Sequence, residues 1–330
     1  MLCDLNYMNI NYLEIIKKAW VATWQNKYLW WFGFFVSLTS GGSFFNYSNS
    51  GLNKQPALSE EKILAFINQH LSVIIIALIA LIIICLLLTI LSLIGRGALI
   101  KSINASDKKE PSNFTIGFSA GKKYFWKILG LGFFPSLFIF AIFTIILVPI
   151  AFLFASHSYI LGTILSIAGI AIFIPLIILV SFLKKYGQMY IILGELNIRS
   201  AIESSYALFR KNMSPSIIMA LIFVLIGIIF GIGVLIACVP LVIIFAILGL
   251  VFYLIFKKVG IMIIAGIGIV IATILLLVLR SIYESFAQAV WVFFFHEIAK
   301  PKITEIAAET VADKIPDPVA TPDPITFSEK

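Results

Sequence analysis

The sequence predicts an all-α integral membrane protein with about six transmembrane helices, and two observations lead to this fold class. Of its 330 residues, 61% are hydrophobic and only 12% are charged, which leaves too little polar surface for a water-soluble globule of this size. The apolar residues are also grouped into uninterrupted runs as long as the roughly 20 helical residues that cross a hydrocarbon core. We therefore expect lipid to be the main solvent of this chain.

Six apolar runs are predicted to cross the membrane. The most continuous is LSVIIIALIALIIICLLLTILSLI, at 71–94. Only Ser156, His157 and Ser158 separate two later runs, so these two are expected to form an antiparallel helical hairpin. The predicted spans are 28–45, 71–94, 128–155, 159–183, 214–239 and 259–280.

The distribution of basic residues favours six spans over seven. The run PLVIIFAILGLVFYLIF at 240–256 is either a separate crossing or a continuation of the preceding helix beyond a bend at Pro240. With six spans most Lys and Arg fall on the cytoplasmic side, as the positive-inside rule requires. Lys257 and Lys258 do not fit this rule, because they fall on the opposite side. Seven spans would move this pair inside but send Arg280 outside. We predict a multi-pass protein of the cell membrane with both termini in the cytoplasm.

Three aromatic and basic segments indicate that the chain contains three diverged helix-hairpin repeats, because each segment leads into a pair of apolar runs. The segments read AWVATWQNK, GKKYFWKIL and SSYALFRKN. Each belongs to a predicted amphipathic helix in the membrane interface, and these helices are placed near 10–27, 112–127 and 197–211.

The first and third interfacial helices have the clearer amphipathic pattern. Trp20 and Trp24 share the apolar face of the first, where they are expected at headgroup depth. The second fits less well, because Gly117 and Gly121 weaken a helix. The residues expected to point away from the apolar face of the third helix are Arg199, Glu203 and Arg210.

The stretch IILGELNIRSAIESSYALFRKN carries Glu195 after an apolar run, and then a short amphipathic helix with an aromatic and basic end. Together with WQNKYLWWFGF and GRGALIKSI, it resembles a broad superfamily of bacterial polytopic membrane proteins that are similar to the membrane domain of glycerophosphoryl diester phosphodiesterases. The resemblance covers residues 12–300 and implies a six-span fold with interfacial helices. It does not imply phosphodiesterase activity, because the catalytic barrel, its paired histidines and its metal-binding carboxylates have no counterpart in the sequence.

The sequence predicts no catalytic residues, no metal site and no cofactor. His70, His157 and His296 are far apart, and His296 with Glu297 lacks the second histidine of a zinc-binding helix. The net charge of +8 does not indicate nucleic-acid binding, because no soluble domain is predicted that could hold a nucleic acid. Residues 300–330 are rich in Pro and acidic residues and are predicted to form a disordered tail.

Two sets of polar residues are candidates for ligand contact. Arg280, Glu284 and Gln288 are spaced four apart and so share one helix face. This polar stripe would be functional inside the hydrocarbon but a solvated salt-bridge face at the interface, and the complete apolar span before Arg280 favours the second interpretation. The candidates for lipid headgroup binding are Lys108, Lys109, Lys122, Lys123 and Lys127, whose charges the topology explains equally well.

Two function classes follow from these observations. In the first, the protein is a non-catalytic membrane component that binds lipid or a partner and organises the bilayer through its interfacial helices. In the second, it is a transporter or channel for a hydrophobic or amphiphilic substrate. The small number of polar residues at mid-membrane depth favours the first class. The expected partners are membrane lipids, anionic lipids among them, and the sequence specifies neither a protein partner nor a homo-oligomer.

Overall fold

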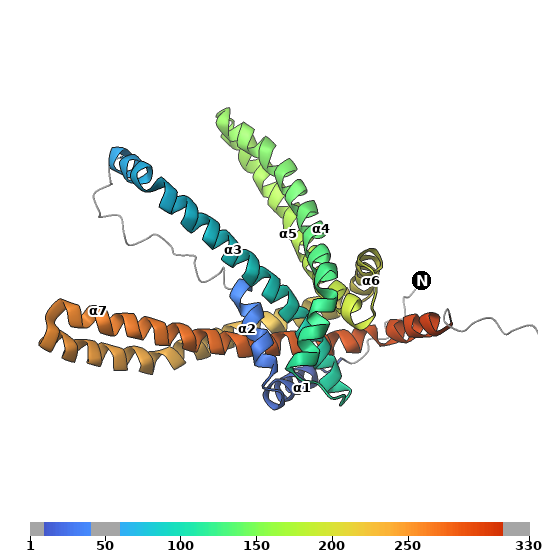
Figure 1. Ribbon diagram of the computed structural model, residues 1–330. Coiled ribbons are helices and arrows are strands. Elements are labelled where there is room, and N and C mark those ends of the chain that lie inside the picture. Colours follow the sequence, from blue (N-terminus) through green and yellow to red (C-terminus); the bar gives the residue numbers. More distant parts are fainter. Residues whose placement is uncertain (1–9, 41–59, 313–330) are drawn as a thin grey trace, which may run out of the picture.

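A computed structural model describes residues 10–40 and 60–312, and all regular structure in these ranges is helical (Figure 1). This agrees with the all-α class. The helices are α1 (Tyr12–Gln25), α2 (Leu29–Ser40), α3 (Glu60–Asp107), α4 (Phe114–Ala155), α5 (Tyr159–Leu193), α6 (Ile198–Lys211) and α7 (Met213–Ala312).

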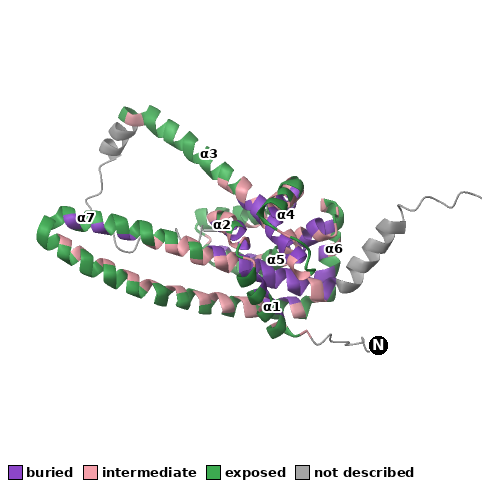
Figure 2. Ribbon diagram, turned by 60° about the horizontal axis from the view of Figure 1, so that its bottom comes forward, coloured by how far each residue is buried: buried purple, intermediate pink, exposed green. Residues whose placement is uncertain are grey.

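Three apolar arms diverge from a common helical core (Figure 1). They are the α3 arm (71–91), the α4–α5 arm (133–181) and the α7 arm (221–278), and large aliphatic and aromatic side chains are exposed along all of them. Buried residues instead gather where the arms meet α1 and α2 (Figure 2). So much exposed apolar surface is unfavourable in water, and the arms are therefore the part of this multi-pass membrane protein that lipid covers.

Four helices of the described residues are long and apolar enough to cross a membrane. They correspond to α3, α4, α5 and α7, of which α7 contains two predicted spans. Each helix extends beyond its predicted span or spans into the core. The helix α2 has 12 residues and is about 18 Å long, which is less than the roughly 30 Å of a hydrocarbon core. The rest of its predicted span, 41–45, lies outside the described residues, and the total of six spans stays a prediction.

The helix α7 reverses direction at Lys257 and forms a hairpin (Figure 1). Lys257 has φ 53° and ψ −135°, a conformation that ends one helix and starts the next. The two halves pack antiparallel, with the rings of Phe230 and Tyr283 stacked at 4.4 Å. The predicted span 214–239 therefore does not end there: the helix continues through Pro240 to the turn, so 240–256 extends it.

The separate interfacial helix predicted at 112–127 is wrong, because α4 is continuous from Phe114 to Ala155. Gly117 and Gly121 do not interrupt it. A side chain at Gly121 would overlap with the backbone carbonyl of Ile94, so this glycine lets α4 pack closely against α3. The gain in helix contact outweighs the low helix propensity of the glycines.

The helix α2 is locked onto the second half of α7. Ser285 Oγ donates a hydrogen bond to the Leu29 carbonyl at 2.9 Å, and Ser281 Oγ donates to the Trp30 carbonyl. Gly33 lies directly against both serines. These contacts set the rotation of α7 and thereby the direction of the face that carries Glu284.

At the C-terminal end, helix α7 continues to Ala312. The prediction of a disordered tail from residue 300 is therefore wrong for 300–312. The remainder, 313–330, lies outside the described residues.

Candidate functional site

Charged side chains from three helices meet where the arms join the core. Arg96 comes from α3, Lys184 and Lys185 from α5, and Glu284 from α7. They line a cavity of about 480 Å³, which we call the basic pocket. Its other lining residues are Val36, Leu93, Ile128, Gly132, Ser136, Ser181, Gln188 and Gln288.

Hydrogen bonds hold the two lysines of the basic pocket in place. The Lys184 ammonium donates to Ser136 Oγ at 2.6 Å. The Lys185 ammonium donates to Gln288 Oε1 at 3.3 Å and lies 5.4 Å from the centre of the Trp291 ring. A cation above an aromatic face is stabilised by the ring quadrupole, so Lys185 is kept at one side of the pocket.

The basic pocket carries more positive than negative charge. Glu284 is its one carboxylate among the described residues, and it already forms an ion pair with Arg280 at 3.2 Å. Arg96 is within electrostatic reach of Glu284 but forms no ion pair or hydrogen bond with the described residues. Because Arg280 takes up the charge of Glu284, the positive charges of Arg96, Lys184 and Lys185 are left to attract an anion.

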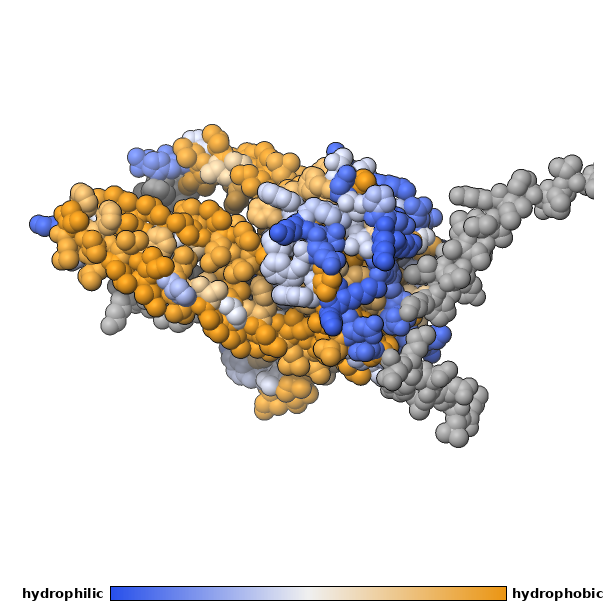
Figure 3. All heavy atoms as spheres, turned by 90° about the horizontal axis from the view of Figure 1, so that it is seen from below, coloured by the Kyte–Doolittle hydropathy of each residue, from blue (hydrophilic) through white to orange (hydrophobic). Residues whose placement is uncertain are grey.

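The pocket lies at the boundary between the lipid-covered arms and the buried core. About two turns before Lys185 along α5, Ile178 is 45% exposed, whereas Tyr186, directly after Lys185, is fully buried. The same change occurs in α3 between Leu87 and Ile100. In the view of Figure 3, hydrophilic residues gather at the core end of the molecule and hydrophobic residues cover most of the surface of the arms. Lipid phosphates lie at such a boundary, and Lys and Arg side chains reach toward it.

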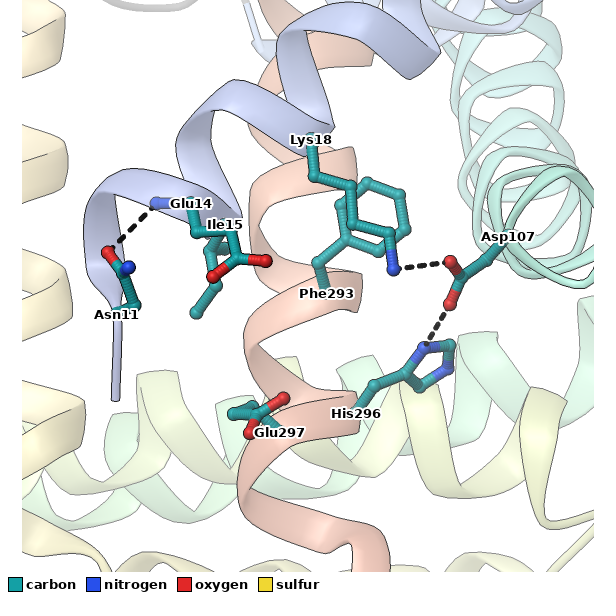
Figure 4. Close-up of a pocket in the computed structure, with 8 residues that line it drawn as sticks. All are labelled: Asn11, Glu14, Ile15, Lys18, Asp107, Phe293, His296 and Glu297. Atoms are coloured by element: carbon teal, nitrogen blue, oxygen red, sulfur yellow. Dashed lines mark hydrogen bonds and ion pairs between the residues drawn. The ribbon is translucent and has the colours of Figure 1, made fainter. Parts of the chain in front are cut away.

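A second charged cluster joins α1 to the ends of α3 and α7 (Figure 4). The Asp107 carboxylate forms an ion pair with Lys18, whose Nζ lies 2.5 Å from Oδ1. Its other oxygen, Oδ2, lies 3.3 Å from Nδ1 of His296. The Lys18 ammonium also lies 4.8 Å from the centre of the Phe293 ring. The Lys18 ammonium and the Asp107 carboxylate neutralise one another, so we interpret these contacts as holding α1 against α3 and α7. No group of residues with metal-ligand geometry occurs among the described residues.

The five lysines predicted as headgroup candidates make different contacts, and their binding to headgroups stays a prediction. Lys108 and Lys109 lie at the end of α3, and Lys122 lies over the Phe118 ring at 5.3 Å. Lys123 forms an ion pair with Glu195 at 3.0 Å, and Lys127 lies within 3.3 Å of the Leu196 carbonyl oxygen.

Glu195 connects α4 to the turn between α5 and α6. It accepts a hydrogen bond from the Tyr124 hydroxyl at 2.7 Å, in addition to its ion pair with Lys123. These two contacts, the tyrosine first, hold the pKa of the Glu195 carboxyl below its ordinary value. Two of the predicted headgroup lysines are thus engaged in attaching α6 to α4.

The two tryptophans of α1 are partly exposed, whereas the ring of Tyr12 in the same helix stacks on Phe294 of α7. Its buried face consists of Ile15, Ala19, Ala22 and Thr23, whereas Trp20 is 51% exposed and Trp24 is 42% exposed. The two tryptophan rings contact each other with centroids 5.5 Å apart. A helix that packs on the protein with small residues and presents tryptophans outward has the composition of a membrane-interface helix.

The helix α6 buries Ala201, Ser205, Leu208 and Phe209. Arg199 and Glu203 form an exposed ion pair at 3.0 Å on the opposite face, and Arg210 is also exposed. Asn197 occupies the N-cap position, but its side chain makes no capping hydrogen bond.

The structure brings only part of the predicted polar stripe into the basic pocket. Glu284 and Gln288 line it, and Arg280 reaches it through its ion pair with Glu284. Sequence reasoning missed Arg96, Lys184 and Lys185 as site residues. They share one signal, since each follows the end of a long apolar run, but the sequence does not show that these ends converge.

Comparison with known proteins gives a family but no close relative. No curated protein and no solved structure matches the chain. The resemblance to the membrane domain of glycerophosphoryl diester phosphodiesterases stays a prediction, because the family match shows no link to those enzymes. Residues 27–299 match the family model described as a family of unknown function (DUF7544), and the chain belongs to that family.

Proposed function

We propose that the protein is a non-catalytic component of the cell membrane that binds anionic lipid in the basic pocket. The observation that carries this proposal is the surplus of positive charge on Arg96, Lys184 and Lys185 at the boundary between arms and core. Each cation near an anionic lipid surface contributes about 1 kcal/mol of attraction. A pocket that holds several cations together therefore favours an acidic headgroup over a zwitterionic one.

The interfacial helices support a role in organising the surrounding bilayer. Trp20 and Trp24 of α1 would anchor the core at headgroup depth, and Arg210 with Lys211 at the end of α6 would contact the same surface. In this arrangement the basic pocket and both helices face the cytoplasmic leaflet, and the two termini lie in the cytoplasm.

Lipid retention in nanodiscs tests the proposal. The protein is placed in discs that contain phosphatidylcholine and phosphatidylglycerol, and the lipids that stay bound are identified by native mass spectrometry. We expect wild type to retain phosphatidylglycerol. The variant Lys184→Ala/Lys185→Ala should lose it, because two charge-assisted contacts are removed.

The matched control removes positive charge from outside the pocket. The variant Lys122→Ala/Lys123→Ala/Lys127→Ala should retain phosphatidylglycerol as wild type does. Loss in this control variant with retention in the pocket variant would overturn the proposal, and so would retention in both.

A transporter for an amphiphilic substrate is the second candidate, because Glu284 and Gln288 of the predicted polar stripe line the cavity. Ionisable groups in a cavity between membrane helices are typical of transport pathways. Lipid transfer between leaflets of proteoliposomes, measured with a fluorescent phosphatidylglycerol, distinguishes the two candidates. Transfer that depends on Glu284 would favour transport, and binding without transfer would favour the structural role.

A further inference from the structure

An apolar groove adjoins the basic pocket. It has a volume of about 320 Å³ and lies between α5 and both halves of α7. Its lining residues are Ile177, Ile178, Ser181, Phe182, Lys185, Ala220 and Trp291. Ser181 and Lys185 line the groove and the basic pocket alike, so the two spaces meet at these residues.

Polarity changes sharply from one space to the other. The pocket contributes three cations together with hydroxyl and amide groups, whereas the groove is lined by aliphatic and aromatic side chains apart from the two shared residues. Ile177 and Ile178 lie about two turns from Lys185 toward the lipid-covered part of the α4–α5 arm, so the groove extends toward the hydrocarbon. This order of polarity matches an amphiphile whose charged end is at the interface.

We propose that the pocket and the groove form one site for an anionic phospholipid, whose phosphate lies among Arg96, Lys184 and Lys185 and whose acyl chain lies in the groove against Trp291. This inference rests on the proposed function and specifies how the lipid is held. Charge complementarity identifies the occupant: a phosphate neutralises the surplus charge of the pocket, and the chain attached to it must leave through the apolar side.

The position of Lys185 fits this arrangement. Its ammonium is directed to Gln288 on the pocket side, and it lies over the Trp291 ring that lines the groove. Lys185 thus stands where the glycerol backbone would pass from polar to apolar surroundings. A lipid whose phosphate is held in the pocket must place its chain in the groove, so a side chain that fills the groove should displace the lipid.

Filling the groove tests the arrangement separately from the charge of the pocket. The variant Ala220→Trp places a large ring in the groove, and Ala265→Trp places the same ring on the exposed surface of the α7 arm as its control. In the same phosphatidylcholine and phosphatidylglycerol nanodiscs, Ala220→Trp should reduce retained phosphatidylglycerol by about tenfold or more, as the Lys184→Ala/Lys185→Ala variant should. Ala265→Trp should retain it.

The fluorescence of Trp291 tests whether the acyl chain of the bound lipid lies in the groove. A small fraction of phosphatidylglycerol with brominated acyl chains is added to the discs, and quenching of Trp291 is obtained as the difference between wild type and Trp291→Phe. We expect this component to be quenched by brominated phosphatidylglycerol and much less by brominated phosphatidylcholine at the same fraction. In the Lys184→Ala/Lys185→Ala variant, brominated phosphatidylglycerol should quench it no more than brominated phosphatidylcholine does.

The possible outcomes distinguish failure of the groove assignment from failure of the proposed lipid binding in the pocket. If the lysine variant loses the lipid but Ala220→Trp keeps it and Trp291 is quenched equally by both brominated lipids, the groove assignment is overturned and lipid binding in the pocket stands. If neither variant loses the lipid, both proposals are overturned. Loss in both variants with headgroup-selective quenching of Trp291 supports both.

Discussion

The contact between α2 and α7 allows a quantitative test of the fold, through the substitution Gly33→Ala. An added methyl group would overlap with the Ser281 carbonyl oxygen and the Ser285 hydroxyl, so the two helices must separate. Overpacking of this kind costs about 1–3 kcal/mol. Separation also weakens the hydrogen bonds from Ser281 and Ser285 to the α2 backbone, at about 1 kcal/mol each. The higher helix propensity of alanine recovers about 1 kcal/mol.

The net expectation for Gly33→Ala is a loss of about 3 kcal/mol in the free energy of unfolding, from the overpacking and hydrogen-bond costs less the propensity gain. This corresponds to a Tm lower by roughly 4 °C for a chain of this size. The assay is thermal unfolding in nanodiscs. The control is Gly266→Ala on the α7 arm, where an added methyl group meets nothing within 4 Å, so that its Tm should be unchanged or higher. Equal Tm values for the two variants would refute the close contact between α2 and α7.

Three further predictions concern individual contacts. Tyr186→Phe removes the 2.7 Å hydrogen bond from the Tyr186 hydroxyl to Ser216 Oγ, and should lower the free energy of unfolding by about 1 kcal/mol, seen as a lower Tm. The contacts that lower the pKa of Glu195 stabilise the attachment of α6 above the ordinary pKa of a glutamate, and this stabilisation is lost as the pH falls through the lowered pKa of the folded state. The protection factors of the α6 amides, which correct for the intrinsic pH dependence of exchange, should therefore fall at acid pH in wild type, whereas in Glu195→Gln they should be low throughout. Asp107→Asn should accelerate exchange in α1, because the carboxylate charge shared by Lys18 and His296 is removed; the control Glu203→Gln, in the exposed pair of α6, should leave α1 unchanged.

The helical class and the apolar runs could be predicted from the sequence because hydropathy is a local property. The three-residue link at Ser156 to Ser158 was sufficient to predict the hairpin of α4 and α5, since no other connection fits so short a link. The turn at Lys257 is different. A lysine pair between two apolar runs is compatible with a loop or with a helix that continues, and local pattern does not choose between them. In the structure, the backbone conformation of Lys257 and the packing of Phe230 on Tyr283 show the reversal.

Much of the candidate site depends on contacts between distant segments, which local patterns do not contain. Gly121 suggested a weak helix, yet it lies in α4 because α3 approaches it closely. Lys123 and Lys127 belong to a basic segment that predicted a headgroup patch. In the structure, Lys123 contacts the Glu195 carboxylate and Lys127 contacts the Leu196 carbonyl oxygen. The spacing of Arg280, Glu284 and Gln288 did predict a shared helix face, whereas the approach of Arg96 and Lys185 to that face required the three-dimensional arrangement.

The arms are continuous with the core, since α3, α4 and α5 each run without a break from lipid-covered residues to buried ones. Such a helix behaves as a lever. The tilt of a membrane helix adjusts to the thickness of the bilayer. A thinner or thicker membrane should therefore rotate the lipid-covered arm of each helix and move the buried end of the same helix in the opposite direction. Arg96 sits near the inner end of one lever and Lys184 near that of another. We therefore expect the separation of these charges, and with it the hold on an anionic headgroup, to vary with the thickness of the surrounding membrane.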